Sequence, residues 1–175
     1  MNSVFSRDSA FNFLQAIAPG AKVYSYDVAD HAEETARTCF RHYRNYRFLH
    51  KSQSEFAPDD IDYAKVDLVF FEAVHDLALN QETWKRAVGS LSERCLVVVH
   101  DTGTWTRSDA LANYGPADLN PQWWLNDEYQ HQRGEREFVN WITREYSDYS
   151  QIHFHSLLTL RHGLTILQRN EPLPT

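Results

Sequence analysis

Two apolar stretches of the chain end abruptly in charged side chains. One reads VDLVFFEAVHD over residues 66–76, and the other reads CLVVVHDTG over residues 95–103. Short apolar runs that stop at a carboxylate or an imidazole are typical of buried strands. Because chemistry in an open α/β sheet gathers at the carboxyl ends of its strands, the two stretches predict one functional edge.

The segments around these strands alternate between helical and strand-like patterns. Apolar residues recur at helical spacing in four segments: 6–18, 30–43, 80–91 and 135–146. Strand-like runs fall at 22–27 and 46–50. Strands and helices that alternate with short connections predict an α/β fold, in which a mostly parallel sheet carries helices on its faces.

Local signals place several boundaries within this pattern. Asp30 with Glu33 three residues later indicates a capping box, and Asn80 is a candidate cap for the third helix. Two strand-like runs, 152–160 and 164–168, flank a turn at 161–163. They predict an antiparallel β-hairpin that closes the sheet at its C-terminal end.

The pattern breaks over residues 104–134. This segment has no clear period, yet it contains Trp105, Trp123 and Trp124. A long irregular segment is usually functional or disordered, and the aromatic residues argue against disorder. We therefore expect a lid over a binding site, in which the tryptophans either stack on a ligand or fix the lid to the body of the protein.

The composition is that of an ordinary globular protein. The chain has 175 residues, long enough for one domain, with 42% hydrophobic and 23% charged residues. A net charge of -7 without a dense Lys/Arg cluster argues against a nucleic-acid partner. We expect no membrane association and a cytoplasmic location, because the chain lacks a membrane-length apolar run and a signal-peptide pattern. Cys39 and Cys95 have no motif spacing and are expected to be core residues.

The order of these pieces resembles a known family. A strand ending in Asp27, a polar loop, VDLVFFEAVHD, VVVHDTG and a terminal hairpin are similar to class I S-adenosylmethionine-dependent methyltransferases, especially the small-molecule O-methyltransferases. The resemblance covers residues 21–169. It implies a Rossmann-like three-layer sandwich, a single methyltransferase-like domain over residues 1–175, and an acceptor lid at 104–134.

The resemblance also implies a cofactor site for S-adenosylmethionine. Asp27 stands where the family binds the ribose hydroxyls, and an acid there can accept two hydrogen bonds. Gln53 and Ser54 occupy the loop that reads the adenine edge, and Glu72 also belongs to the implied cofactor site. The alternative for Asp27 is that it only shapes the turn before Asp30.

A second implied site faces a small-molecule acceptor. By resemblance, Glu72, His100 and Asp101 would hold a divalent metal, magnesium in the family, and His75 would act as the general base. A metal would orient the acceptor hydroxyl and lower its pKa. The nitrogen of His100 suits manganese or iron better than magnesium, and hydrogen bonds between the histidines and carboxylates without a metal are the alternative.

The beginning of the chain departs from the family pattern. The family's glycine-rich loop follows a first strand, but no glycine precedes Gly20, and the helix at 6–18 matches the one that normally follows that loop. The fold is therefore expected to be N-terminally incomplete. Either Met1 is an internal methionine of a longer reading frame, or this is a short homologue whose sheet closes differently or is completed by a partner chain. An exposed central edge also predicts a homo-oligomer.

Three functions follow from these observations. The leading hypothesis is a methyltransferase that acts on a hydroxyl of a small metabolite, with or without a metal ion. The alternative is a non-catalytic binding or assembly protein that has kept the methyltransferase fold and lost the cofactor loop. A different nucleotide-binding α/β enzyme is disfavoured, because no GxGxxG follows a strand.

Overall fold

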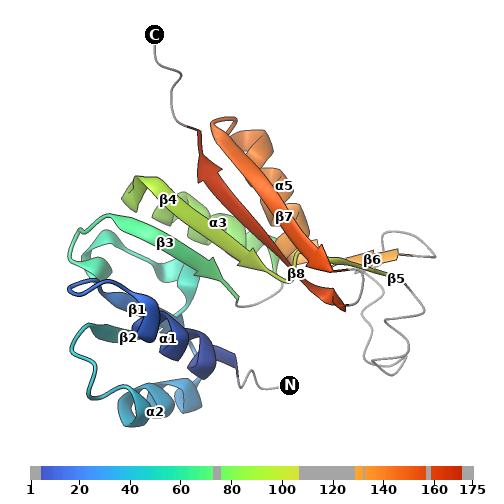
Figure 1. Ribbon diagram of the computed structural model, residues 1–175. Coiled ribbons are helices and arrows are strands. Elements are labelled where there is room, and N and C mark those ends of the chain that lie inside the picture. The colour runs from blue at the N-terminus through green and yellow to red at the C-terminus, as the bar shows by residue number, and fades with distance from the viewer. Residues whose placement is uncertain (1–4, 73–75, 107–128, 132, 157–158, 171–175) are drawn as a thin grey trace. The chain divides into compact units, whose positions relative to one another are not determined.

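The computed structural model describes residues 5–72, 76–106, 129–131, 133–156 and 159–170 (Figure 1). Contacts divide the chain into two compact units, Met1–Tyr63 and Ala64–Thr175. Each unit has its own hydrophobic core. No helix in these described ranges is long and apolar enough to cross a membrane.

The first unit is built on a parallel pair of strands, β1 (Val23–Asp27) and β2 (Tyr46–His50). The helices α1 (Phe5–Ala16) and α2 (Asp30–Cys39) contribute the buried residues of its core, which are Ala10, Leu14 and Ala36, together with Phe40 just beyond α2. Alternate strand residues Val23, Tyr46 and Phe48 pack against this cluster. The period-two pattern of the strands thus gives one face to the helices.

The second unit contains a four-stranded sheet in the order β3-β4-β8-β7. Its strands are β3 (Val66–Phe71), β4 (Leu91–His100), β7 (Tyr149–Ser156) and β8 (Thr159–Arg169). β3 and β4 are parallel, whereas β8 pairs antiparallel with both β4 and β7. The predicted α/β class and the C-terminal antiparallel hairpin are both confirmed.

Two helices cover one face of this sheet. They are α3 (Leu77–Ala87), which continues into a 3-10 turn η3 (Val88–Ser90), and α5 (Arg133–Glu145). Trp84 of α3 lies 6.2 Å from the ring of Phe138 of α5, and Val97, Val99 and Leu167 close the core from the sheet. Cys95 also lies in this core, as predicted, and burial raises the pKa of its thiol to about 12.

The opposite face of the sheet carries an apolar row. Phe70, Val98, Ile166 and Ile152 are consecutive register partners across the four strands. On the same face Leu68 pairs with Leu96, and Phe154 pairs with Leu164. Ile152 and Phe154 are 61% and 52% exposed. We call this surface the open face.

The segment predicted as irregular has ordered ends. β5 (Thr104–Thr106) and β6 (Tyr129–His131) form a short antiparallel pair. Residues 107–128, with Trp123 and Trp124, lie outside the described residues, so the acceptor lid remains a prediction.

The predicted capping residues of two helices were wrong. Ala29 is the cap of α2 and has no capping side chain, so Asp30 lies inside the first turn. Asp76 caps α3 by accepting a hydrogen bond from the Leu79 amide at 2.9 Å, whereas Asn80 is buried within the helix. Each helix begins directly after a capping residue with an extended backbone, Ala29 or Asp76. The periodicity of apolar residues does not locate such a boundary.

The hairpin turn also lies elsewhere than predicted. Residues 161–163, predicted as the turn, lie within β8, and Gly163 has a φ of 25°. A Cβ atom at Gly163 would lie 2.6 Å from the Gly103 Cα. The glycine therefore permits close contact with the turn after β4 and does not mark the hairpin turn.

Candidate functional site

Asp27 ends β1 and organises the turn that follows it. Its Oδ1 accepts a hydrogen bond from the Ala29 amide at 2.9 Å. The intervening Val28 is 66% exposed. The turn-shaping alternative for Asp27 is thus observed, and it does not conflict with ligand binding, because a carboxylate has about four acceptor positions on its two oxygens.

Gln53 and Ser54 lie on a fixed turn at the same end of the β1–β2 pair. They belong to the 3-10 helix η1 (Gln53–Glu55), which begins three residues after β2. Ser52 caps this helix: its Oγ accepts from the Ser54 amide at 3.3 Å, and the Glu55 carboxylate accepts from the Ser52 amide at 3.0 Å. Because β1 and β2 are parallel, Asp27 and this turn share one edge.

A buried carboxylate that sequence reasoning missed anchors the next segment. Asp60, in the 3-10 helix η2 (Pro58–Ile61), is 8% exposed. It accepts hydrogen bonds from Lys51 Nζ at 2.6 Å, the Ala57 amide at 2.9 Å and the Tyr26 hydroxyl at 3.1 Å. Burial acts to raise the pKa of Asp60, but these donors outweigh it and lower the pKa. The sequence predicts only a turn at residues 58–60, because the side chains that bind Asp60 come from Tyr26 of β1 and from Lys51 after β2.

The two charged strand ends of the second unit converge as predicted. Glu72 directly follows β3 and His100 ends β4, and the two strands are paired up to Phe71 and Val99. His100 Nδ1 lies 3.7 Å from Glu72 Oε1 and 3.4 Å from Asp101 Oδ1. All three side chains are between 14% and 27% exposed. This acid–imidazole cluster is therefore partly buried.

The backbone at this cluster adopts an uncommon conformation. Asp101 has a φ of 59°, in the left-handed region that non-glycine residues seldom adopt. Such positions persist where the surroundings hold them, and they often occur at functional sites. His75, the predicted general base, lies outside the described residues, so its position relative to the cluster remains a prediction.

A buried polar network supports the turn after Asp101. Thr165 Oγ1 is hydrogen-bonded to Thr102 Oγ1, at 2.7 Å, and lies 2.5 Å from His153 Nδ1. Arg136 Nη1 lies 3.3 Å from the Thr102 carbonyl oxygen and 3.0 Å from His153 Nδ1. Because a guanidinium only donates, Nδ1 of His153 is an acceptor. No sequence signal marks this network, which joins residues 63 positions apart.

The side chains of the acid–imidazole cluster can be compared with the ligands that divalent metals prefer. Two carboxylates and one imidazole are ligands that manganese, iron or zinc accept more readily than magnesium does. Among the described residues, however, no group of three or more His, Cys, Asp or Glu side chains is arranged to hold a metal ion. The metal site at Glu72, His100 and Asp101 therefore stays a prediction.

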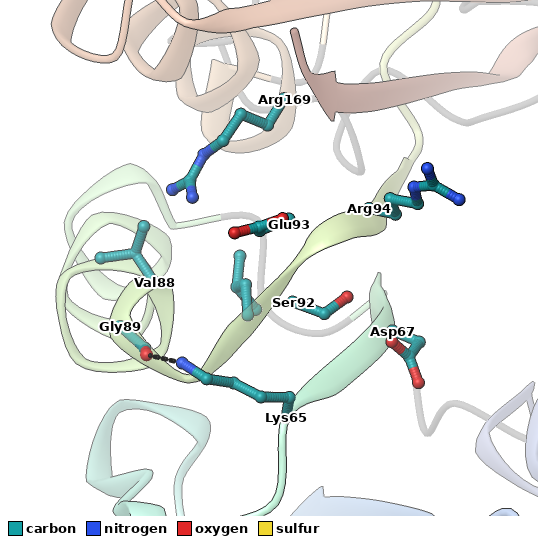
Figure 2. Close-up of a pocket in the computed structure, with 9 residues that line it drawn as sticks. Lys65, Asp67, Val88, Gly89, Ser92, Glu93, Arg94 and Arg169 are labelled. Atoms are coloured by element: carbon teal, nitrogen blue, oxygen red, sulfur yellow. Dashed lines mark hydrogen bonds between the residues drawn. The ribbon is translucent and has the colours of Figure 1, made fainter. Parts of the chain in front are cut away.

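A cavity of about 700 Å³ lies at the other end of the same sheet, where β3 and β4 begin (Figure 2). It forms where the pairing shifts from Val66–Leu91 to Leu68–Leu96. Its lining mixes positive and negative side chains, including Lys65, Glu93 and Arg169. The cavity is separate from the acid–imidazole cluster, which lies at the carboxyl ends of the strands.

Comparisons with solved structures identify the fold. The O-methyltransferase TomG from Streptomyces achromogenes, solved with S-adenosylmethionine, matches with a TM-score of 0.60 at 14% identity, over 90% of this chain and 66% of that one. An O-methyltransferase from Bacillus cereus, solved with S-adenosylhomocysteine, gives 0.57 at 14% identity over 89% and 66%. The plantazolicin methyltransferase BpumL gives 0.58 at 12% identity over 94% and 73%.

These matches show that the chain has the fold of class I S-adenosylmethionine-dependent methyltransferases. It spans about two thirds of the length of TomG and of the Bacillus cereus enzyme. No protein-family model and no curated protein sequence matches it. At this identity the likeness establishes the fold, and the activity has to be argued from the site.

Proposed function

We propose that this protein is an S-adenosylmethionine-dependent methyltransferase that acts on a hydroxyl group of a small molecule. The observation that carries the proposal is the position of Asp27 at the carboxyl end of β1, beside the exposed Val28, in a fold shared with methyltransferases. Other α/β folds also bind nucleotides at such an edge. The cofactor is therefore inferred from the fold and the residue together.

The first unit supplies groups suited to the nucleoside part of the cofactor. Asp27 would accept hydrogen bonds from the two ribose hydroxyls, and Val28 offers an apolar contact to the planar base. Gln53 and Ser54 would read the polar edge of the adenine from the turn after β2. When bound, S-adenosylmethionine supplies an electrophilic methyl group on a sulfonium centre.

The second unit supplies groups suited to an acceptor hydroxyl. An alcohol becomes a better nucleophile when a base removes its proton as the carbon–oxygen bond forms. His75 is the proposed base, and Glu72, His100 and Asp101 would orient the hydroxyl by hydrogen bonds. If these three residues bind a divalent metal, it would assist by lowering the pKa of the hydroxyl.

Calorimetric titration with S-adenosylmethionine and S-adenosylhomocysteine tests the proposal directly. We expect saturable binding of both, and transfer of a labelled methyl group to members of a panel of phenols, catechols and sugars. Repeating the titration with magnesium and with manganese tests metal assistance. Binding without transfer to any acceptor would favour the non-catalytic alternative, and absence of binding would refute the proposal.

A further inference from the structure

His50 occupies a special position at the cofactor edge of the first unit. It ends β2 and is the register partner of Asp27. Its Nε2 lies 3.0 Å from the Val28 carbonyl oxygen, and its Nδ1 lies 2.9 Å from Glu33 Oε2 of α2. Asp30 Oδ1 lies 3.6 Å from Nε2. One side chain therefore links the end of β2, the turn after β1 and the start of α2.

Both ring nitrogens of His50 face acceptors. A backbone carbonyl and a carboxylate can only accept, so both contacts are hydrogen bonds only when the ring carries two protons. The hydrogen bond to Val28 and the carboxylates of Glu33 and Asp30 raise the pKa of His50. The neutral ring has one proton, and it must then give up one of the two hydrogen bonds.

The turn that His50 contacts is the one that carries Asp27. From inside the turn, Asp27 Oδ1 accepts from the Ala29 amide. From outside, His50 binds the carbonyl of the intervening Val28. The turn is thus fixed on both sides of one peptide group, and the link that His50 makes between Val28 and Glu33 is complete only when its ring carries two protons.

We propose that His50 is a positioning residue for the S-adenosyl ligand: its protonated ring ties the Val28 carbonyl to Glu33 and holds the Asp27 carboxylate in place for the ribose. This inference rests on the proposed function. It assigns to His50 a role that neither the family resemblance nor the sequence pattern gave it. Ligand affinity then depends on pH, and it decreases as pH rises and the ring loses its second proton.

Ligand titrations between pH 6 and pH 9 on the full chain test this role. The probes are S-adenosylhomocysteine and 5′-methylthioadenosine; the latter lacks the amino-acid group, whose own ionisation would affect the profile. In the wild type we expect affinity to fall about three- to tenfold over this range, the effect of losing one charge-assisted hydrogen bond. In His50→Gln, affinity at pH 6 should already be reduced by a similar factor and should not change further with pH.

The matched control is His42→Gln, which removes an exposed histidine of the same unit. It should keep the wild-type pH profile. Thermal unfolding of each variant verifies that the folded state is measured, and the amide-exchange rate of Ala29 reports the turn directly. Faster Ala29 exchange in His50→Gln is expected.

Different outcomes separate the two proposals. If the wild type binds neither probe at any pH, the proposed function fails, and the role of His50 in ligand binding fails with it. If the wild type binds and His50→Gln shows the same affinity and the same pH profile, only the role of His50 is refuted. Unchanged Ala29 exchange in His50→Gln would likewise refute it.

Discussion

Asp27 is the residue on which the proposed cofactor site depends most. The substitution Asp27→Asn keeps an oxygen that can accept from the Ala29 amide, but it removes the charge offered to the ribose. We expect S-adenosylhomocysteine affinity to fall about ten- to a hundredfold, the usual effect of losing hydrogen bonds to a charged group. Titration calorimetry measures this change.

The exposed acid Asp59 of the same unit provides the control for this substitution. Asp59→Asn should leave affinity unchanged, and both variants should unfold at the wild-type temperature. Equal affinity in Asp27→Asn and the wild type would remove Asp27 from the site.

Gly163 has no room for a side chain. Its backbone φ is 25°, and an added Cβ would overlap Gly103. We expect Gly163→Ala to lower the free energy of unfolding by about 2–4 kcal/mol, because both the overlap and the backbone conformation are unfavourable. Urea denaturation gives the value.

Gly89 offers a matched comparison, since a Cβ there meets no atom within 4 Å. Gly89→Ala should change the free energy of unfolding by less than about 0.5 kcal/mol. Similar losses in the two variants would contradict the close contact at Gly103.

Among the elements, α3 has a cap, Asp76, whose contribution to the stability of the protein can be measured separately. Asp76→Ala removes the acceptor for the Leu79 amide, and we expect a loss of about 1 kcal/mol in the free energy of unfolding. Asp76→Asn keeps an acceptor and should restore most of the stability in the same urea titration. A full loss in Asp76→Asn would mean that the side chain acts in another way.

The stability of the first unit should also depend on pH, both on the acid side and on the alkaline side. The pKa of Asp60 is lowered on folding, so its contribution is present above the unfolded value of about 3.9 and is lost as pH falls through the folded pKa. The pKa of His50 is raised, so its contribution is complete below about 6.5 and is lost as pH rises through the folded pKa. Stability from these two groups is therefore greatest between about pH 4 and pH 6.5.

Variants separate the two sides of this profile. Lys51→Met should weaken the stabilisation of ionised Asp60 and flatten the acid side of a plot of unfolding free energy against pH. His50→Gln should flatten the alkaline side only. If both variants change the same side, the assignment of the two groups is wrong.

The local pattern of apolar and polar residues predicted some elements correctly and misplaced others. The predicted strand at 46–50 matches β2, and the apolar beginning of the stretch at 66–76 matches β3, which ends where the apolar run meets Glu72. The cap of α3 was misplaced, since Asn80 fits a cap by residue type but lies inside the helix. Convergence of Glu72, His100 and Asp101 was predictable because parallel strands bring their carboxyl ends together.

The remaining features depend on partners distant in sequence. His50, Asp60 and the network from Arg136 to Thr165 are held by contacts with other elements. Glu33 was interpreted as part of a capping box, whereas it pairs with His50 across α2 and β2. Such contacts are set by tertiary packing, and a single sequence gives no signal for them.

At the scale of the whole molecule, two surfaces favour association between copies of the chain: the open face and the edge of β3. In the described part of the chain β3 pairs only with β4, and the open face exposes Ile152 and Phe154. Unpaired edges and contiguous apolar surfaces favour association. We propose a homo-oligomer, and light scattering at micromolar concentration should give at least twice the monomer mass of 20.5 kDa.

A double variant tests which surface is used. Ile152→Lys with Phe154→Lys places two like charges on the open face and should shift the mass towards the monomer. Lys65→Glu, at the start of β3 away from this face, should not change the mass. A monomeric wild type would refute the proposed assembly.

The order of strands in the second unit has a consequence for its synthesis on the ribosome. Of the four described strands of this sheet, β8 is the last to be made, yet it lies between β4 and β7 and pairs with both. Until it emerges, β4 presents an apolar, unpaired edge to its surroundings, and the core residue Leu167 is missing. Completion of this sheet must therefore wait until β8 has left the ribosome, a period in which chaperone binding would compete with aggregation.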